Sequence, residues 1–174
     1  MLEVISTKIV KARKEHRCML SHLRIHVGTQ YEKQILKFDG EIYTFITSLK
    51  AKELAEKLEM YERVSNTGEG LHDDEYEEFL SDFIDEHCLD EDDSFLSSKT
   101  ECVHDYFFGF DAGDDDGQRN FVLGNEFDDY AMNVNKNFQI GYSAGYLDGW
   151  NKMSKLPSED IKDMKESLLS EEEE

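Results

Sequence analysis

Two stretches within the first fifty residues alternate between apolar and polar side chains, with the two-residue period of a β-strand. The first covers residues 31–38 and the second covers residues 42–47. Asp39-Gly40 lies between them, and this dipeptide favours a type I′ turn because both central residues of that turn need positive φ. The pattern predicts a β-hairpin, preceded by an approach strand.

A helix is expected directly after the hairpin, because apolar residues then recur at three- and four-residue spacing and Ser48 can cap the first turn. These apolar positions are Ala51, Leu54, Ala55, Leu58 and Tyr61. The first module therefore has a ββα order.

A second amphipathic helix is predicted near residues 74–88. Its apolar stripe consists of Tyr76, Phe79, Leu80, Phe83, Ile84 and Cys88. Carboxylates cover the rest of its surface: Asp74, Glu75, Glu77, Glu78, Asp82, Asp85 and Glu86. A stripe of this kind faces a protein core, so the carboxylates are expected to face outward.

Residues 102–108 and 118–123 contain many β-forming side chains, and they predict a second hairpin. The acidic loop expected between them, residues 111–117, contains Asp114, Asp115 and Asp116. This loop does not fit the calcium loop of an EF-hand, because the glycine and the final glutamate fall out of register.

A long helix is expected from about Glu126 to Met153, and a short helix is expected to begin at Pro157-Ser158. Gly141, Gly145 and Gly149 recur at four-residue spacing in the long helix. Each interior glycine costs about 1 kcal/mol relative to alanine. We therefore expect another backbone to approach this face closely, either within the fold or across a homodimer seam.

Charge divides the chain into two parts. The whole chain has a formal net charge of −21. Residues 1–63 carry 12 basic and 9 acidic residues, whereas residues 64–174 carry 7 basic and 31 acidic residues. The change coincides with a glycine-containing polar stretch at residues 65–70. The sequence thus predicts an α+β protein, with a ββα module at 1–64 packed on an acidic, mainly helical part at 65–174 that contains the second hairpin.

Composition also narrows the classes of partner. A chain with so many carboxylates repels phosphates, so direct binding of nucleic acid by a broad surface and binding to an anionic membrane are not expected. No apolar run approaches the length of a membrane span, and no secretory signal precedes the first strand. Three cysteines suggest reduced thiols, so we expect a cytosolic protein.

The first ninety residues resemble a family of small phage and mobile-element proteins that carry a treble-clef-like zinc site. The matching positions are Ala12-Arg13-Lys14, Cys18, Ile25, Gly28, Tyr31, Asp39-Gly40, Tyr43-Thr44 and the helix segment Glu53-Leu54-Ala55-Glu56-Lys57-Leu58. The resemblance implies a treble-clef-like module and an origin in phages or mobile elements.

The zinc ligands of that family are mostly lost here. The second ligand position falls on Ser21, and the two later ones fall near Ser48 or Lys50 and on Ala51, so only Cys18 survives. One thiolate does not hold zinc. A metal-free module with a packed centre is expected, and a re-routed site through His16, His22 and His26 is the alternative.

Other candidate chemistry is sparse. His87 and Cys88 could join Cys102 and His104 in a second, alternative zinc site, although Cys88 also continues an apolar stripe. No glycine-rich phosphate loop, G-x-S-x-G elbow or H-E-x-x-H helix occurs. We expect no cofactor and no enzymatic activity, and a metal-dependent hydrolase remains the third alternative.

The acidic excess suggests a protein partner. Such a surface can occupy a groove that normally binds phosphates. With the resemblance, this predicts a phage or mobile-element accessory protein that inhibits a basic, nucleic-acid-binding host defence protein, as an anti-CRISPR or anti-restriction mimic of nucleic acid. The expected contacts are the acidic residues of the 74–88 helix, with Asp114–Asp116 secondary. The alternative is a non-catalytic structural or regulatory adaptor that homodimerises or docks a partner through Gly141, Gly145 and Gly149.

Overall fold

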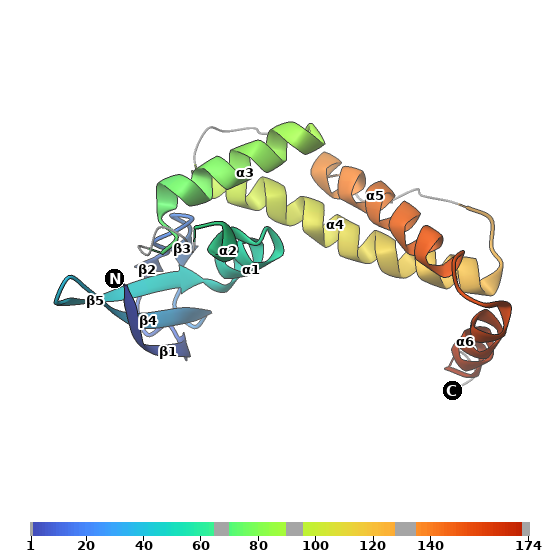
Figure 1. Ribbon diagram of the computed structural model, residues 1–174, viewed down its shortest axis with the longest axis horizontal. Coiled ribbons are helices and arrows are strands. Elements are labelled where there is room, and N and C mark those ends of the chain that lie inside the picture. The colour runs from blue at the N-terminus through green and yellow to red at the C-terminus, as the bar shows by residue number, and fades with distance from the viewer. Residues whose placement is uncertain (1, 65–69, 90–95, 128–134, 172–174) are drawn as a thin grey trace. The chain divides into compact units, whose positions relative to one another are not determined.

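The structure is a computed structural model that describes residues 2–64, 70–89, 96–127 and 135–171. Within these residues the chain is an α+β protein, as the sequence predicts (Figure 1). The strands are β1 (Glu3–Lys11), β2 (His16–Arg17), β3 (Arg24–Ile25), β4 (Gln30–Phe38) and β5 (Glu41–Ser48). The helices are α1 (Leu49–Lys57), α2 (Met60–Val64), α3 (Asp73–His87), α4 (Leu96–Leu123), α5 (Lys136–Met153) and α6 (Ser158–Glu171).

The predicted hairpin is formed by β4 and β5. They pair antiparallel from Phe38 opposite Glu41 to Tyr31 opposite Ser48. Asp39 and Gly40 have φ values of 49° and 87°, as a type I′ turn requires. β1 pairs with the other edge of β4, which gives the strand order β1-β4-β5, and β2 and β3 form a separate two-residue ladder. The ladder of β2 and β3 is called the knuckle below.

The helix after the hairpin begins as predicted. The Ser48 hydroxyl accepts a hydrogen bond from the Ala51 amide at 3.2 Å, and α1 buries Ala51, Leu54 and Ala55. The helix ends earlier than its apolar spacing suggests, because Glu59 has a φ of 53° and interrupts it. Tyr61 therefore lies on the separate helix α2.

The predicted second hairpin is wrong. Residues 102–108, 111–117 and 118–123 all lie within one continuous helix, α4. The reason is tertiary packing: residues 109–117 place a glycine at every fourth position, and those glycines contact α5. The predicted long helix is also shorter than expected, because α5 begins at Lys136, and residues 128–134 lie outside the described chain.

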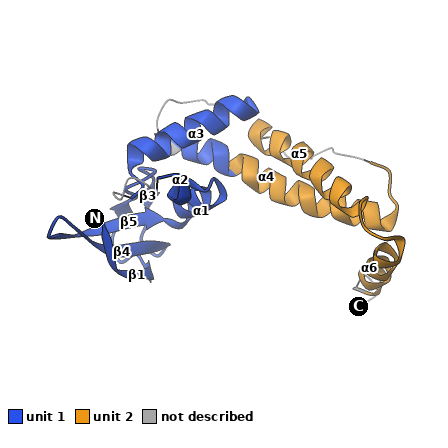
Figure 2. Cartoon of the chain, viewed as in Figure 1, with its two compact units in different colours: residues 1–104 blue, residues 105–174 orange. Residues whose placement is uncertain are grey.

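The chain divides into two compact units, residues 1–104 and 105–174, with the division inside α4 (Figure 2). The predicted boundary at 64/65 follows the change in charge, and the residues just after it, 65–69, lie outside the described chain. Three contacts join α3 and the residues just before it to the rest of the first unit. His22 Nε2 lies 3.0 Å from Asp73 Oδ2, the Arg63 guanidinium lies 5.4 Å from the Phe79 ring centre, and Leu71 lines a pocket with residues of the sheet.

Candidate partner-binding surface on helix α3

The ends of α3 are stabilised by local contacts. Glu75 Oε2 accepts a hydrogen bond from the His72 amide at 3.0 Å, which caps the start of the helix. Asp73, Asp74 and Glu75 lie in the first turn, where negative charge complements the helix dipole. Cys88 ends the helix in the left-handed conformation, with φ of 51°.

One face of α3 is buried, as its apolar stripe predicts. Tyr76, Leu80 and Ile84 are its buried residues. The Thr100 hydroxyl of α4 lies 3.5 Å from the Tyr76 hydroxyl, and both side chains are fully buried. Burial raises the pKa of Tyr76 well above its ordinary value, because the phenolate would lose its hydration. α3 therefore has a fixed orientation, which determines where its carboxylates point.

The opposite face of α3 carries a row of exposed carboxylates. We call it the α3 acidic face, and it consists of Asp74, Glu78, Asp82, Asp85 and Glu86. These positions extend over about 18 Å at a rise of 1.5 Å per residue. The helix contains no Lys or Arg, and within the described residues no ion pair uses any of these five side chains. The face is thus a line of carboxylates that the described protein does not neutralise.

Two of the seven predicted contact residues on α3 form hydrogen bonds within the protein. Glu75 caps the helix, as described above, and Glu77 accepts from Lys99 Nζ at 2.9 Å. Lys99 also donates to the Ser81 hydroxyl at 3.0 Å, so it bridges α4 to the side of α3. Both glutamates are half-buried, whereas the residues of the α3 acidic face are exposed.

The secondary set, Asp114 to Asp116, lies on α4 rather than in a loop. Asp114 forms an ion pair with Lys152 at 3.0 Å, and Asp116 accepts from the Tyr142 hydroxyl at 2.8 Å. Hydrogen bonds to Asp148 and Asp114 raise the pKa of Lys152. Asp115 is exposed and borders a groove against α6. Two of these three carboxylates therefore serve the packing of α4 on α5.

The glycine stripe of α5 packs against α4. A Cβ atom at Gly141, Gly145 or Gly149 would overlap a backbone carbonyl oxygen of α4. The reverse also holds, because Cβ atoms on α4 would overlap carbonyl oxygens of α5 at Gly109, Gly113 and Gly117. Contact positions increase together along both helices, so α4 and α5 run parallel, side by side (Figure 1). We call this contact the glycine seam.

The sequence analysis singled out the glycines of α5 but not those of α4. The α4 glycines can be recognised from an internal repeat: residues 106–117 and 138–149 share aromatic residues, three glycines at four-residue spacing, an alanine and an aspartate at matching positions. The contacts follow the repeat: Gly113 meets Tyr142 just as Gly145 meets Phe110. The seam occupies the face that was the candidate dimer surface.

The positions that the resemblance matches to zinc ligands form a compact, hydrogen-bonded centre. Cys18 Sγ accepts the amide of Ser21 at 3.4 Å and the amide of Ser48 at 3.3 Å. Cys18, Ser21 and Ala51 are each at most 1% exposed. These positions therefore lie together, and main-chain hydrogen bonds to the Cys18 sulfur hold them in place.

The alternative zinc ligands do not form a cluster. Among the described residues, no three of His87, Cys88, Cys102 and His104 bring ligand atoms within 4.8 Å of one another. His87 stacks on the Phe83 ring, with ring centres 4.0 Å apart, and its Nδ1 lies 3.0 Å from the Phe83 carbonyl oxygen. Cys102 is buried, whereas Cys88 is exposed.

The chain matches no family model, no curated protein and no solved structure. Among the helices that the structure describes, none combines the length and the apolar character that crossing a bilayer requires.

Proposed function

We propose that the protein binds a basic, nucleic-acid-binding protein through the α3 acidic face and keeps nucleic acid out of that partner's groove. The observation that carries the proposal is the unneutralised row of five exposed carboxylates. Five charges that span about 18 Å have a mean spacing of about 4.5 Å, compared with 3.4 Å along one strand of duplex DNA. A groove lined for a phosphate backbone would meet a sparser but comparable line of negative charge.

The identity of the partner is proposed from the resemblance of the first ninety residues to phage and mobile-element proteins. A host defence protein that handles nucleic acid, as in CRISPR or restriction systems, is a partner of this chemistry in the host cytosol. The role of this chain is non-catalytic, because competition for a groove needs only binding. Homodimerisation through Gly141, Gly145 and Gly149 has less support, because that stripe packs within the chain.

Two matched variants test this proposal. The first neutralises the α3 acidic face by Glu78→Gln, Asp82→Asn, Asp85→Asn and Glu86→Gln. The second makes the same changes in residue type on α6, by Glu159→Gln, Asp160→Asn, Asp163→Asn and Glu166→Gln, all of them exposed. Both variants remove four negative charges, so a difference between them reports position and not net charge.

Capture from host lysate on the immobilised protein provides the readout. We expect the wild type and the α6 variant to retain the same nucleic-acid-binding protein, added DNA to displace it, and the α3 variant to lose it. Equal capture by the two variants would remove the support for α3 as the binding surface.

A further inference from the structure

Several exposed basic side chains on and between the strands of the N-terminal module have no acidic partner within the part of the chain that the structure describes. The exposed ones are Lys8, Lys11, Arg13, Lys14, Arg17, Arg24 and Lys37. Within the described residues, no ion pair involves any of them, whereas lysines elsewhere pair with carboxylates: Lys50, Lys52, Lys57, Lys99, Lys152 and Lys162. In a chain with 40 acidic residues, these seven positions set the N-terminal module apart from the rest of the chain.

Two arginines of this set, Arg17 and Arg24, belong to the knuckle. They lie directly opposite each other in the antiparallel ladder of β2 and β3. Like charges in that position are destabilising. Arg17 Nε donates to the His22 carbonyl oxygen at 3.1 Å, which fixes the direction of its guanidinium group. An anion held between the two arginines would relieve their repulsion.

The knuckle also has a hollow large enough for an anion. Its volume is about 630 Å³, and it is lined by Glu15, His16, Arg17, His22, Leu23 and Arg24. Two carboxylates lie nearby: Glu15 lines the hollow and lies 3.6 Å from His26 Nδ1, and Asp73 lies 3.0 Å from His22 Nε2. Arg17 and Arg24 supply the permanent positive charges of the lining, because a guanidinium group stays protonated.

We propose that this knuckle hollow binds a phosphate group, with Arg17 and Arg24 as its two cationic contacts. A guanidinium group offers paired N–H donors that match two oxygens of a phosphate. Residues opposite each other in an antiparallel ladder are about 5 Å apart, so both side chains reach one phosphate. The phosphate belongs either to an oligonucleotide backbone or to a free nucleotide.

The overall negative charge does not prevent this contact. At physiological ionic strength the Debye length is about 8 Å, so exposed carboxylates farther than that from the hollow are largely screened. The proposal goes beyond the function proposed for α3. It depends on different residues and on a ligand of opposite charge, so either proposal can fail without the other.

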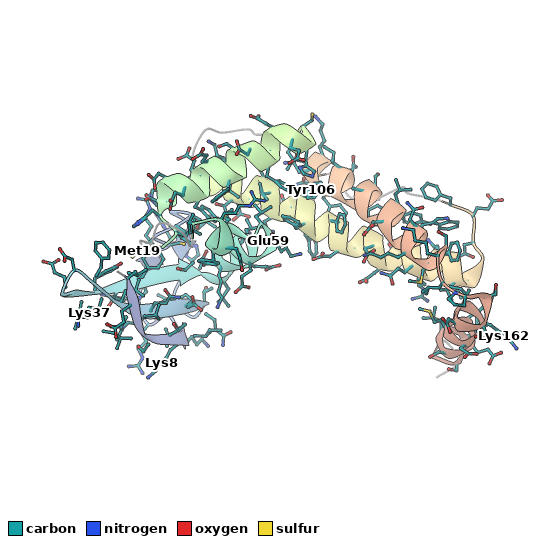
Figure 3. The ribbon with its side chains drawn as sticks, in the orientation of Figure 1. Lys8, Met19, Lys37, Glu59, Tyr106 and Lys162 are labelled. Carbon is teal, nitrogen blue, oxygen red and sulfur yellow. The ribbon has the colours of Figure 1, made fainter. Side chains whose placement is uncertain are left out.

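The test uses the full chain and two double variants. Arg17→Gln with Arg24→Gln removes the proposed contacts. Lys8→Gln with Lys37→Gln removes the same charge from exposed positions on the sheet (Figure 3). Fluorescence anisotropy measures binding of a labelled single-stranded oligonucleotide of about 12 nucleotides in about 0.1 M salt. NMR follows the arginine side-chain N–H signals during titration with inorganic phosphate.

We expect phosphate to shift the Arg17 and Arg24 signals, and we expect oligonucleotide binding to weaken about tenfold in the arginine variant but less than twofold in the lysine variant. Shifts with phosphate and no oligonucleotide binding would assign the hollow to a small phosphate compound. No shift with phosphate, or equal weakening in both variants, would overturn the proposal. If the arginine pair fails to fold, Arg24→Gln alone replaces it, because within the described chain no hydrogen bond uses the Arg24 side chain.

Discussion

Gly145 of α5 lies so close to the main chain of Phe110 on α4 that a methyl group on its Cα would overlap the Phe110 carbonyl oxygen. The same relationship recurs from α4 to α5, where Gly113 lies against the carbonyl of Tyr142. Tyr106, which is labelled in Figure 3, contributes the carbonyl that meets Gly141. Two helix backbones can approach this closely only where side chains are missing from both.

Gly145→Ala is therefore expected to destabilise the protein. Alanine would favour the helix by up to about 1 kcal/mol in an open position, but here it forces the two backbones apart. We expect the free energy of unfolding to fall by about 1–3 kcal/mol, as in other overpacked sites. Urea denaturation followed by circular dichroism measures this change. Asn151→Ala on an exposed position of α5 is the control and should be neutral or slightly stabilising; an equal effect in both variants would contradict the packing argument.

Cys18 is expected to be structural and not a metal ligand. Cys18→Ala removes the acceptor for the amides of buried Ser21 and half-buried Ser48, and a buried amide left unsatisfied costs about 1–3 kcal/mol. Thermal melting should show a clear loss of stability, whereas Cys88→Ser at an exposed position should change little. A zinc chelator should leave the melting temperature of the wild type unchanged. A drop with chelator would show that a metal stabilises the module.

The strand β4 contains a buried carboxylate whose negative charge is neutralised by one lysine. The Glu32 side chain is 3% exposed, and it accepts hydrogen bonds from Lys52 and, at 2.9 Å, from Gln34. The hydrogen bond to Glu32 raises the pKa of Lys52. Lys52→Met should lower the free energy of unfolding by about 3 kcal/mol, because it leaves a buried charge without its cation.

A second substitution separates this effect from lost packing. Glu32→Gln in the Lys52→Met background removes the unpaired charge and should restore part of the lost stability. If the double variant is no more stable than Lys52→Met alone, the buried charge is not the cause of the loss.

Stability should also fall in alkali. Burial raises the pKa of Tyr76, and it raises the pKa of Tyr61 to about 12. The pKa of the folded state lies above the unfolded value near 10, so the folded state binds the phenol proton more tightly than the unfolded state. The resulting stabilisation is complete below pH 10 and is lost as the pH rises further. The buried Tyr76 contributes up to about 1.4 kcal/mol per pH unit in that range. Urea denaturation at several pH values should show this slope, and Tyr76→Phe should reduce it; an unchanged slope would exclude Tyr76 as its source.

Local pattern was enough to predict the β4–β5 hairpin, the start of α1 and the helix α3. Asp39-Gly40 between two alternating runs specifies the β4–β5 hairpin, and the stripe of Tyr76, Leu80 and Ile84 specifies the orientation of α3. The outward carboxylates follow from that stripe. The sequence pattern does not show which of these carboxylates form ion pairs within the protein. Glu77 binds a lysine 22 residues away, and no local periodicity reveals such a contact.

The second unit shows where local reasoning fails. Residues 102–108 consist largely of β-formers, and glycines at 109, 113 and 117 interrupt any helical propensity that follows. The helix forms because those glycines fit the backbone of α5, a contact between segments about 30 residues apart. Comparison of residues 106–117 with residues 138–149 would have revealed the pattern, because the two segments share their glycine spacing.

If the α3 acidic face occupies a basic groove of its partner, it competes there with nucleic acid. The most direct test measures the affinity of the captured partner for the wild type and for the two matched variants, with DNA as competitor. We predict that the α3 variant binds at least about thirtyfold more weakly, since four charge contacts are lost, while the α6 variant stays within about threefold of the wild type. Equal affinities for the α3 and α6 variants, or a partner that binds DNA and this protein at the same time without competition, would contradict the claim.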